Sequence, residues 1–126
     1  MIIGIGTDLL KMSGISAAVL TDGDPFYDKI FTPEEKRQAA SSPEPGNWLR
    51  RRFAGKEAVF KALSEDPDRG RICEIGILDD ELGAPYVTLY GDLKERAQAR
   101  GIVKIHLSLS SDGDYALAFA VAESRP

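Results

Sequence analysis

The chain has 126 residues, of which 43% are hydrophobic and 29% are charged, and its formal net charge is −4. This length and composition indicate one globular domain over 1-126 and exclude an intrinsically disordered chain. The acidic balance argues against the broad basic face that nucleic-acid-binding proteins use, so no nucleic-acid partner is expected.

The first predicted element is a short buried strand over residues 1–7, in which Gly4 and Gly6 allow a neighbouring backbone to approach closely. Asp8 follows, at a position where aspartate most often forms a turn or caps a helix. The apolar start is too short for a signal peptide or a membrane span. A single cysteine, Cys73, allows no disulfide framework, so we expect a cytoplasmic protein with no membrane partner.

Two helices are predicted before the centre of the chain. Residues 9–20 favour a helix, although Ser13 and Gly14 weaken it, and a loop follows over 21–25. The stronger signal is Thr32-Pro33-Glu34-Glu35, a capping box with proline at the first helical position. It predicts a helix that runs to about Ser41.

The central helix is predicted over 50–63, with Asn47 as its cap. Its apolar residues recur at helical spacing and predict a buried stripe made of Leu49, Phe53, Phe60 and Leu63. A ridge of small residues, which would let another backbone come close, consists of Ala54, Ala58 and Ala62.

Glu57 interrupts this helix on or beside its apolar face, and Lys61 follows four residues later. An ordinary surface ion pair at this spacing is worth about 0.3–0.5 kcal/mol, and a functional site is the alternative. The positive residues of the helix would suit a small polyanion or an acidic partner, although a solvated face would look the same. They are Arg50, Arg51, Arg52, Lys56 and Lys61.

The second half alternates strands with turns. We expect a polar loop over 65–71, strands over 72–78 and 86–90 with a turn between them, and a short helix over 92–100 that Gly101 ends.

The last segment predicts a hairpin around Asp112-Gly113. Apolar residues from Val103 to Leu109 alternate with polar ones, so one face of this strand should be core. The return strand, 115–122, has alanine at every second position, and this face can only pack closely on a helix or another subunit. The predicted fold class is α+β, with an antiparallel sheet packed against the central helix.

The residues limit the possible chemistry. One histidine, His106, and one cysteine nearly exclude the usual zinc ligand sets, and no P-loop or dinucleotide-binding motif is present. Two carboxylates from distant segments, Asp8 and Glu57, would suit Mg²⁺ holding a pyrophosphate, with Lys61 neutralising charge. Sequence alone does not bring the two carboxylates together.

Five motifs, in order along nearly the whole chain, resemble the bacterial holo-acyl-carrier-protein synthases, the short 4′-phosphopantetheinyl transferases. They are Ile3-Gly4-Ile5-Gly6-Thr7-Asp8, Phe31-Thr32-Pro33-Glu34-Glu35, Arg52-Phe53-Ala54-Gly55-Lys56-Glu57-Ala58 with Lys61-Ala62-Leu63, Gly83-Ala84-Pro85 and His106-Leu107-Ser108-Leu109-Ser110.

The resemblance implies an enzyme of fatty acid biosynthesis that transfers 4′-phosphopantetheine from coenzyme A to a serine of apo acyl carrier protein. It implies Mg²⁺ on Asp8 and Glu57, phosphate contact by Lys61, and a homotrimer with active sites between subunits. Glu57 is the candidate base. The remaining implied site residues are Arg52 near the nucleotide and Ser110, Ser111 and Asp112 from the neighbouring subunit.

The chain departs from the family pattern at three positions. Ser111 stands where the family has a second histidine that positions the phosphates. Lys11 and Gly14 stand where the family commonly has Glu and a carrier-contacting Arg, so Lys11 or Lys29 would have to rebuild the docking surface. The alternative function is therefore a non-catalytic or weakened homologue that binds coenzyme A or carrier protein.

Overall fold

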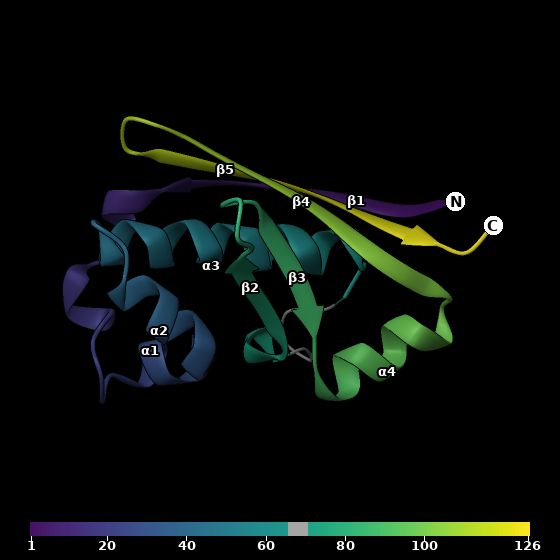
Figure 1. The fold of residues 1–126 in the computed structure, drawn as a ribbon, viewed down its shortest axis with the longest axis horizontal. Coiled ribbons are helices and arrows are strands. Elements are labelled where there is room, and N and C mark those ends of the chain that lie inside the picture. The colour runs from purple at the N-terminus through teal and green to yellow at the C-terminus, as the bar shows by residue number, and fades with distance from the viewer. Residues whose placement is uncertain (66–70) are drawn as a thin grey trace.

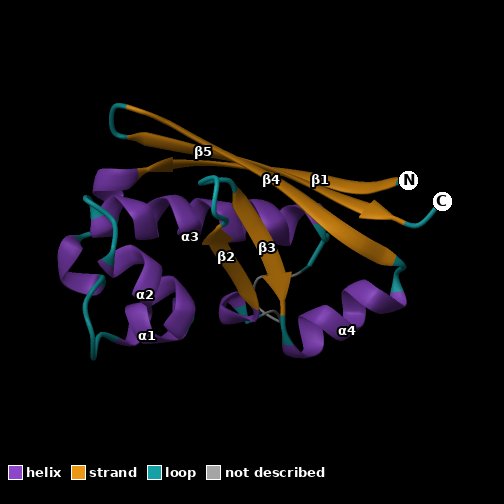
Figure 2. Cartoon of the chain, in the orientation of Figure 1, coloured by secondary structure: helices purple, strands orange, loops and turns teal. Residues whose placement is uncertain are grey.

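The computed structural model describes residues 1–65 and 71–126. A three-stranded sheet lies across the long helix α3, with α1 and α2 towards one end of α3 and α4 towards the other (Figures 1 and 2). The helices and strands are β1 (Ile2–Lys11), α1 (Pro25–Ile30), α2 (Pro33–Ala40), α3 (Pro45–Ala62), β2 (Ile75–Asp79), β3 (Pro85–Leu89), α4 (Gly91–Ala99), β4 (Ile102–Asp112) and β5 (Tyr115–Ser124). The predicted α+β class is confirmed.

The large sheet has the order β1-β5-β4, with both pairs antiparallel, and β2 and β3 form a separate two-stranded sheet. The alanine face of β5 is buried: Ala116, Ala118, Ala120 and Ala122 are at most 1% exposed. These residues belong to the same apolar core as Ala54, Ala58 and Ala62 of α3. The chain's own helix therefore covers the alanine face, and no second subunit is needed there.

The opposite face of this sheet is open within one chain. Its large apolar side chains remain 42–67% exposed, namely Ile5, Leu9, Tyr115, Leu117 and Phe119. The apolar surface left for a partner is thus the face that the alanines do not occupy.

The predicted close approach at Gly4 and Gly6 is confirmed. A Cβ atom at Gly4 would lie 2.0 Å from the carbonyl oxygen of Ala62, and one at Gly6 would lie 2.1 Å from that of Ala58. The backbone of α3 therefore rests directly on β1.

The prediction of a helix over residues 9–20 is wrong. β1 continues to Lys11, and two short 3-10 turns follow at Met12–Gly14 and Ala17–Val19. Leu9 pairs with Leu117 and Leu10 with Ala116, so the strand ladder with β5 overrides the local helical preference.

The start of α3 also differs from the prediction. The helix begins at Pro45, whose ring fixes a helical φ and whose missing N–H costs nothing at the first helical position. Asn47 is already inside the helix, and its Oδ1 accepts a hydrogen bond from Arg50 Nη1 at 3.0 Å.

Two strand predictions need correction. Ile72–Glu74 forms a 3-10 turn, so β2 starts later than predicted, at Ile75. A bulge in β4 lies between Ile102 and Lys104, and it leaves Val103 53% exposed while Ile102 is buried. An extra residue in a strand reverses the alternation on one side of it, and this reversal moves Val103 out of the core.

Other elements agree with the sequence. α2 has both hydrogen bonds of its capping box, Gly101 ends the last helix with a φ of 77°, and Gly113 turns the hairpin with a φ of 58°. Most of the loop predicted over 65–71 lies outside the described residues. No helix in the described part of the chain is long and apolar enough to cross a membrane.

The contact between β1 and α3 makes a steric prediction. The Gly6→Ala variant should lose at least about 3 kcal/mol of unfolding free energy, because the new methyl group meets a backbone carbonyl. Urea denaturation measures this loss. The matched control is Gly14→Ala, whose new Cβ would have no atom within 4 Å, and its stability should change by no more than about 0.5 kcal/mol. Equal stability of the two variants would contradict the packing.

Candidate active site

Asp8 lies in the middle of a strand, paired with Ala118 of β5, so it neither forms a turn nor caps a helix. Gly4 contacts Ala62 and Gly6 contacts Ala58. A step of two residues forward along β1 therefore corresponds to a step of about one helical turn backward along α3. Two strand residues span about 6.6 Å and four helical residues about 6 Å, which explains the match. The next step along this face brings Asp8 level with Ala54, in the turn of α3 that also holds Glu57.

Lys61 reaches from α3 to β1. Its Nζ donates a hydrogen bond to the carbonyl oxygen of Thr7 at 2.8 Å and lies 3.5 Å from Asp8 Oδ1. The Lys61 side chain is 57% exposed and that of Asp8 is 18% exposed. Lys61 therefore links the two elements, which a simple surface pair along one helix would not do.

Glu57 is half-buried, and the charges of Asp8 and Lys61 both affect its pKa. Burial raises the pKa of Glu57 above its ordinary value, the negative charge of Asp8 raises this pKa further, and Lys61 opposes the rise. Lys61 lies 3.5 Å from Asp8, and the charges of both residues act on Glu57. The structure thus places the two predicted metal ligands and the predicted phosphate contact in one neighbourhood.

The donor set of this cluster fits Mg²⁺. Two carboxylates lie together at a partly open surface, and their mutual repulsion favours a cation between them. Within residues 1–65 and 71–126, no group of three or more His, Cys, Asp or Glu side chains could hold a metal ion. Mg²⁺ usually takes one or two protein carboxylates and keeps water and phosphate oxygens at its other positions.

A second group of predicted residues lines a cleft of about 240 Å³ elsewhere on the chain. Arg52, Ser110 and Ser111 all contribute to its wall. Arg52 Nη2 lies 2.5 Å from Asp79 Oδ1, and its guanidinium carbon lies 3.9 Å from the centre of the Trp48 ring. The cleft therefore has a cationic group already held in place.

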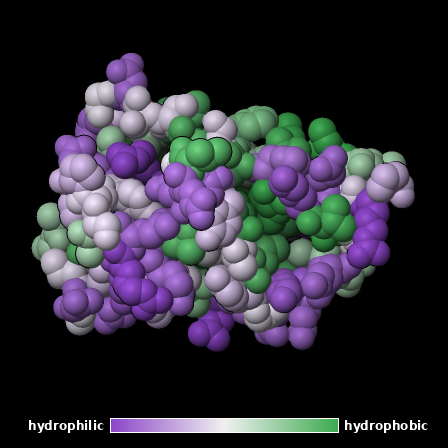
Figure 3. Space-filling view, in the orientation of Figure 1, coloured by the Kyte–Doolittle hydropathy of each residue, from purple (hydrophilic) through white to green (hydrophobic). Residues whose placement is uncertain are grey.

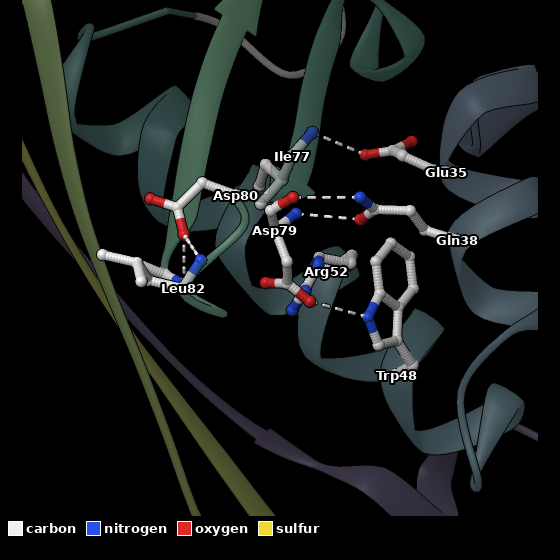
Figure 4. Close-up of polar contacts among 9 residues, drawn as sticks. Glu35, Gln38, Trp48, Arg52, Ile77, Asp79, Asp80 and Leu82 are labelled. Carbon is white, nitrogen blue, oxygen red and sulfur yellow. Dashed lines mark hydrogen bonds and ion pairs between the residues drawn. The ribbon is translucent and has the colours of Figure 1, made fainter.

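Asp79 organises this cleft (Figure 4). Its Oδ2 accepts a hydrogen bond from Trp48 Nε1 at 3.1 Å, and its backbone exchanges two hydrogen bonds with the side chain of Gln38. Burial lowers the pKa of Arg52 and the charge of Asp79 opposes this effect, so Arg52 stays a cation. Sequence reasoning missed Asp79, because its partners come from α2 and α3.

The β4 residues of the second group do not meet the first group within one chain. Asp8 pairs with Ala118, and Ala118 pairs with Leu109, so Asp8 and β4 are separated by the width of β5. Two strand spacings are about 10 Å. Ser110, Ser111 and Asp112 therefore lie away from the Asp8–Glu57 pair of their own chain.

Sequence reasoning also missed a buried ion pair. Lys56 Nζ donates hydrogen bonds to Glu35 Oε1 at 2.7 Å, the carbonyl of Ile30 at 2.9 Å and the carbonyl of Ile75 at 2.6 Å. Glu35 Oε2 accepts a bond from the amide of Ile77 at 2.8 Å. Both charged side chains are 0% exposed, so Lys56 is no part of a basic helix face.

A signal for this pair was present in the sequence. Lys56 is spaced seven residues after Leu49, four before Phe60 and seven before Leu63, so it belongs to the buried stripe. The residue that interrupts the apolar face is Lys56, and Glu57 lies on its flank. Of the positive residues of this helix, Lys56 and Arg52 are both buried, so neither belongs to a solvated face.

Comparison with known proteins gives a consistent result. Residues 4–120 match the family model of the 4′-phosphopantetheinyl transferase superfamily. The chain is 41% identical over 125 residues to a holo-acyl-carrier-protein synthase of Neisseria gonorrhoeae, covering 98% of this chain and 99% of the relative. It is 37% identical over 126 residues to one of Vibrio cholerae, covering 99% of this chain and all of the relative.

Solved structures show the same similarity. The crystal structure of the synthase from Neisseria meningitidis has a TM-score of 0.87 at 38% identity and covers 98% of this chain and 100% of its own. A synthase–coenzyme A complex from Chronobacterium ammoniagenes has a TM-score of 0.82 at 30% identity, covering 98% of both chains.

Because the Lys56–Glu35 pair is buried, we expect replacement of Lys56 to lower the unfolding free energy strongly. Lys56→Met leaves the Glu35 carboxylate without its cation, so it should lose about 3–5 kcal/mol in urea unfolding. Lys36→Met breaks a partly exposed pair with Asp28 and a contact with the Tyr27 ring, and it should lose at most about 2 kcal/mol. If Lys56→Met does not fold, the double variant Lys56→Met/Glu35→Leu should recover folding. Similar losses in the two lysine variants would contradict the burial.

Proposed function

This chain belongs to the 4′-phosphopantetheinyl transferase superfamily, and on that premise we propose that the cluster of Asp8, Glu57 and Lys61 carries its activity. The enzyme is a holo-acyl-carrier-protein synthase: it transfers 4′-phosphopantetheine from coenzyme A to apo acyl carrier protein. The observation that carries the proposal is the meeting of the three side chains across β1 and α3. The whole chain, 1-126, serves as one transferase domain.

The reaction defines what these residues must do. A serine hydroxyl of the carrier attacks the β-phosphorus of coenzyme A, and a new P–O bond forms. The bond from the β-phosphorus to the bridging oxygen breaks, and adenosine 3′,5′-bisphosphate leaves with the bonding electrons. The hydroxyl proton needs a base, and Glu57 is the candidate, a half-buried carboxylate one helical turn before Lys61 on α3.

Asp8 and Glu57 would hold Mg²⁺, which neutralises the diphosphate charge when it is bound. The side chain of Lys61 is flexible and exposed, so its ammonium group can turn from Asp8 towards a phosphate oxygen. Its positive charge would then stabilise the charge that develops during transfer.

The cleft around Arg52 is proposed to bind the nucleotide end of coenzyme A. Arg52 lies in the wall of the cleft as a buried cation paired with Asp79, and Ser110 and Ser111 contribute exposed hydroxyl groups to the same wall. Asp112 lies at the end of β4, opposite Tyr115, and we assign it to the site of a neighbouring copy. The separation of this cleft from Asp8 favours a site that is shared between chains.

The open face of the sheet supports a homotrimer. Leu9, Leu117 and Phe119 are large apolar side chains exposed together on this face, and further copies of the chain would cover them. An enzyme with these substrates works in the cytoplasm, and no nucleic acid or membrane takes part in the proposed reaction.

One observation favours a second candidate, a weakened or non-catalytic homologue that binds coenzyme A or carrier protein. Ser111 lines the cleft beside Arg52, where the family pattern has histidine. A serine hydroxyl cannot supply the charge or the reach of an imidazolium to a phosphate.

The test of transfer is mass spectrometry of apo carrier protein after incubation with coenzyme A, Mg²⁺ and this enzyme. The wild type should add one phosphopantetheine group, and chelation of Mg²⁺ should stop the addition. Glu57→Gln should lower the rate at least about 100-fold while the fold is retained, because an amide is a weaker magnesium ligand and no base.

The control variant is Glu81→Gln, an exposed residue of the β2–β3 turn, which should leave the rate unchanged. Full activity of Glu57→Gln would remove Glu57 from the mechanism. Binding of coenzyme A by the wild type without any adduct would establish the second candidate instead.

The oligomer makes a separate prediction. Leu117→Glu places a charge in the open apolar face and should convert the trimer to monomers in sedimentation experiments, with loss of activity because the site is shared. Leu82→Glu, at a position 94% exposed on the β2–β3 turn, should remain trimeric and active. A wild-type protein that sediments as a monomer would contradict the proposal.

A further inference from the structure

A groove of about 350 Å³ lies between β3, α4 and β4, apart from the carboxylate cluster and from the Arg52 cleft. Its apolar lining comes from Val87, Leu89, Ala97, Ile102 and Ile105. In Figure 3, apolar surface is visible in a hollow that hydrophilic residues border, in the region where Figure 1 shows these three elements. Pockets for small molecules have this size and a largely apolar lining.

The fold creates the groove by keeping two sheets apart. β3 pairs with β2 and β4 pairs with β5, and the facing edges of β3 and β4 share no ladder in the described part of the chain. The bulge at Ile102/Lys104 turns Val103 out to the groove, where it is 53% exposed. Bulges commonly re-aim side chains in this way.

The charged part of the lining is entirely positive. Lys94 of α4 and Lys104 of β4 contribute to it, and the described lining residues include no carboxylate. Among residues 1–65 and 71–126, neither lysine forms an ion pair within 4.0 Å. Glu123 pairs in register with Lys104, but its carboxylate is 3.0 Å from His106 Nε2.

We infer that this groove binds a single-chain amphiphilic anion, a medium-chain fatty carboxylate. The hydrocarbon chain would lie on the aliphatic lining, and the carboxylate would accept hydrogen bonds from Lys94 and Lys104. The combination of aliphatic floor and cationic rim favours this ligand, because a purely apolar molecule would leave the lysines unused and a small inorganic anion would leave the floor uncovered.

The groove is independent of the proposed catalysis. Lys104 pairs with Glu123 near the end of β5, whereas Asp8 pairs with Ala118 in its middle. Binding of the carboxylate should therefore not compete with coenzyme A.

The experiment is a titration of the full chain with decanoate, below its micelle concentration, followed by backbone amide NMR and calorimetry. We expect saturable binding with shift changes at Val87, Val103 and Ile105, unaltered by coenzyme A. The double variant Lys94→Glu/Lys104→Glu should bind decanoate about tenfold more weakly. Arg37→Glu combined with Lys29→Glu, at exposed positions on α2 and α1, is the matched control for net charge, and its affinity should stay unchanged.

Decanol separates the contribution of charge from that of the hydrocarbon. It should bind the wild type more weakly than decanoate does, and the double variant should bind it as the wild type does. Any of three results would overturn the inference: no saturable binding of decanoate, equal decanoate affinity in the double variant, or shift changes confined to the open face at Leu9 and Leu117.

Discussion

The ion pair of Lys56 and Glu35 is the constraint on which the rest of the structure depends. An ammonium with no access to water must find acceptors inside the protein, and Lys56 finds them in three separate elements. These bonds tie the end of α1, the start of α2 and the start of β2 to one position on α3. Glu57 is the next residue along α3, so the same bonds that join the elements also fix where this carboxylate lies. Such a pair specifies an arrangement more than it stabilises one.

The sequence predicts those parts of the fold that local chemistry decides. The capping box of α2 and the turn glycines act within a few residues, and the alternation around β5 reports a face that stays buried over its whole length. Predictions fail where a distant partner decides. Leu9 and Leu10 are in a strand because they pair with β5. Val103 is displaced by a bulge that the sequence pattern of β4 does not predict. The proline at the start of α3 outweighs the capping tendency of Asn47.

The candidate site shows the same division. Asp8 and Glu57 could be selected by residue type and by family resemblance, but their meeting depends on the contact of Gly4 and Gly6 with α3. The sequence groups Lys56 with the other positive residues of α3, because a charge is normally solvated, although its spacing places it with Leu49 and Phe60. Asp79 has no distinguishing sequence pattern at all, since its role arises from Trp48 and Arg52 of α3. Spacing identifies a face of a helix, whereas only the fold shows which element covers it.

The contact between β1 and α3 has a consequence for how this protein can evolve. The nearest atoms facing Gly4 and Gly6 are main-chain carbonyl oxygens, which every amino acid carries. A crowded pair of side chains can be relieved by shortening the opposite partner, but no replacement on α3 shortens a carbonyl group. A genetic screen for suppressors of a damaged Gly6 should therefore return the original glycine codon, and compensating changes elsewhere should be absent from the recovered clones.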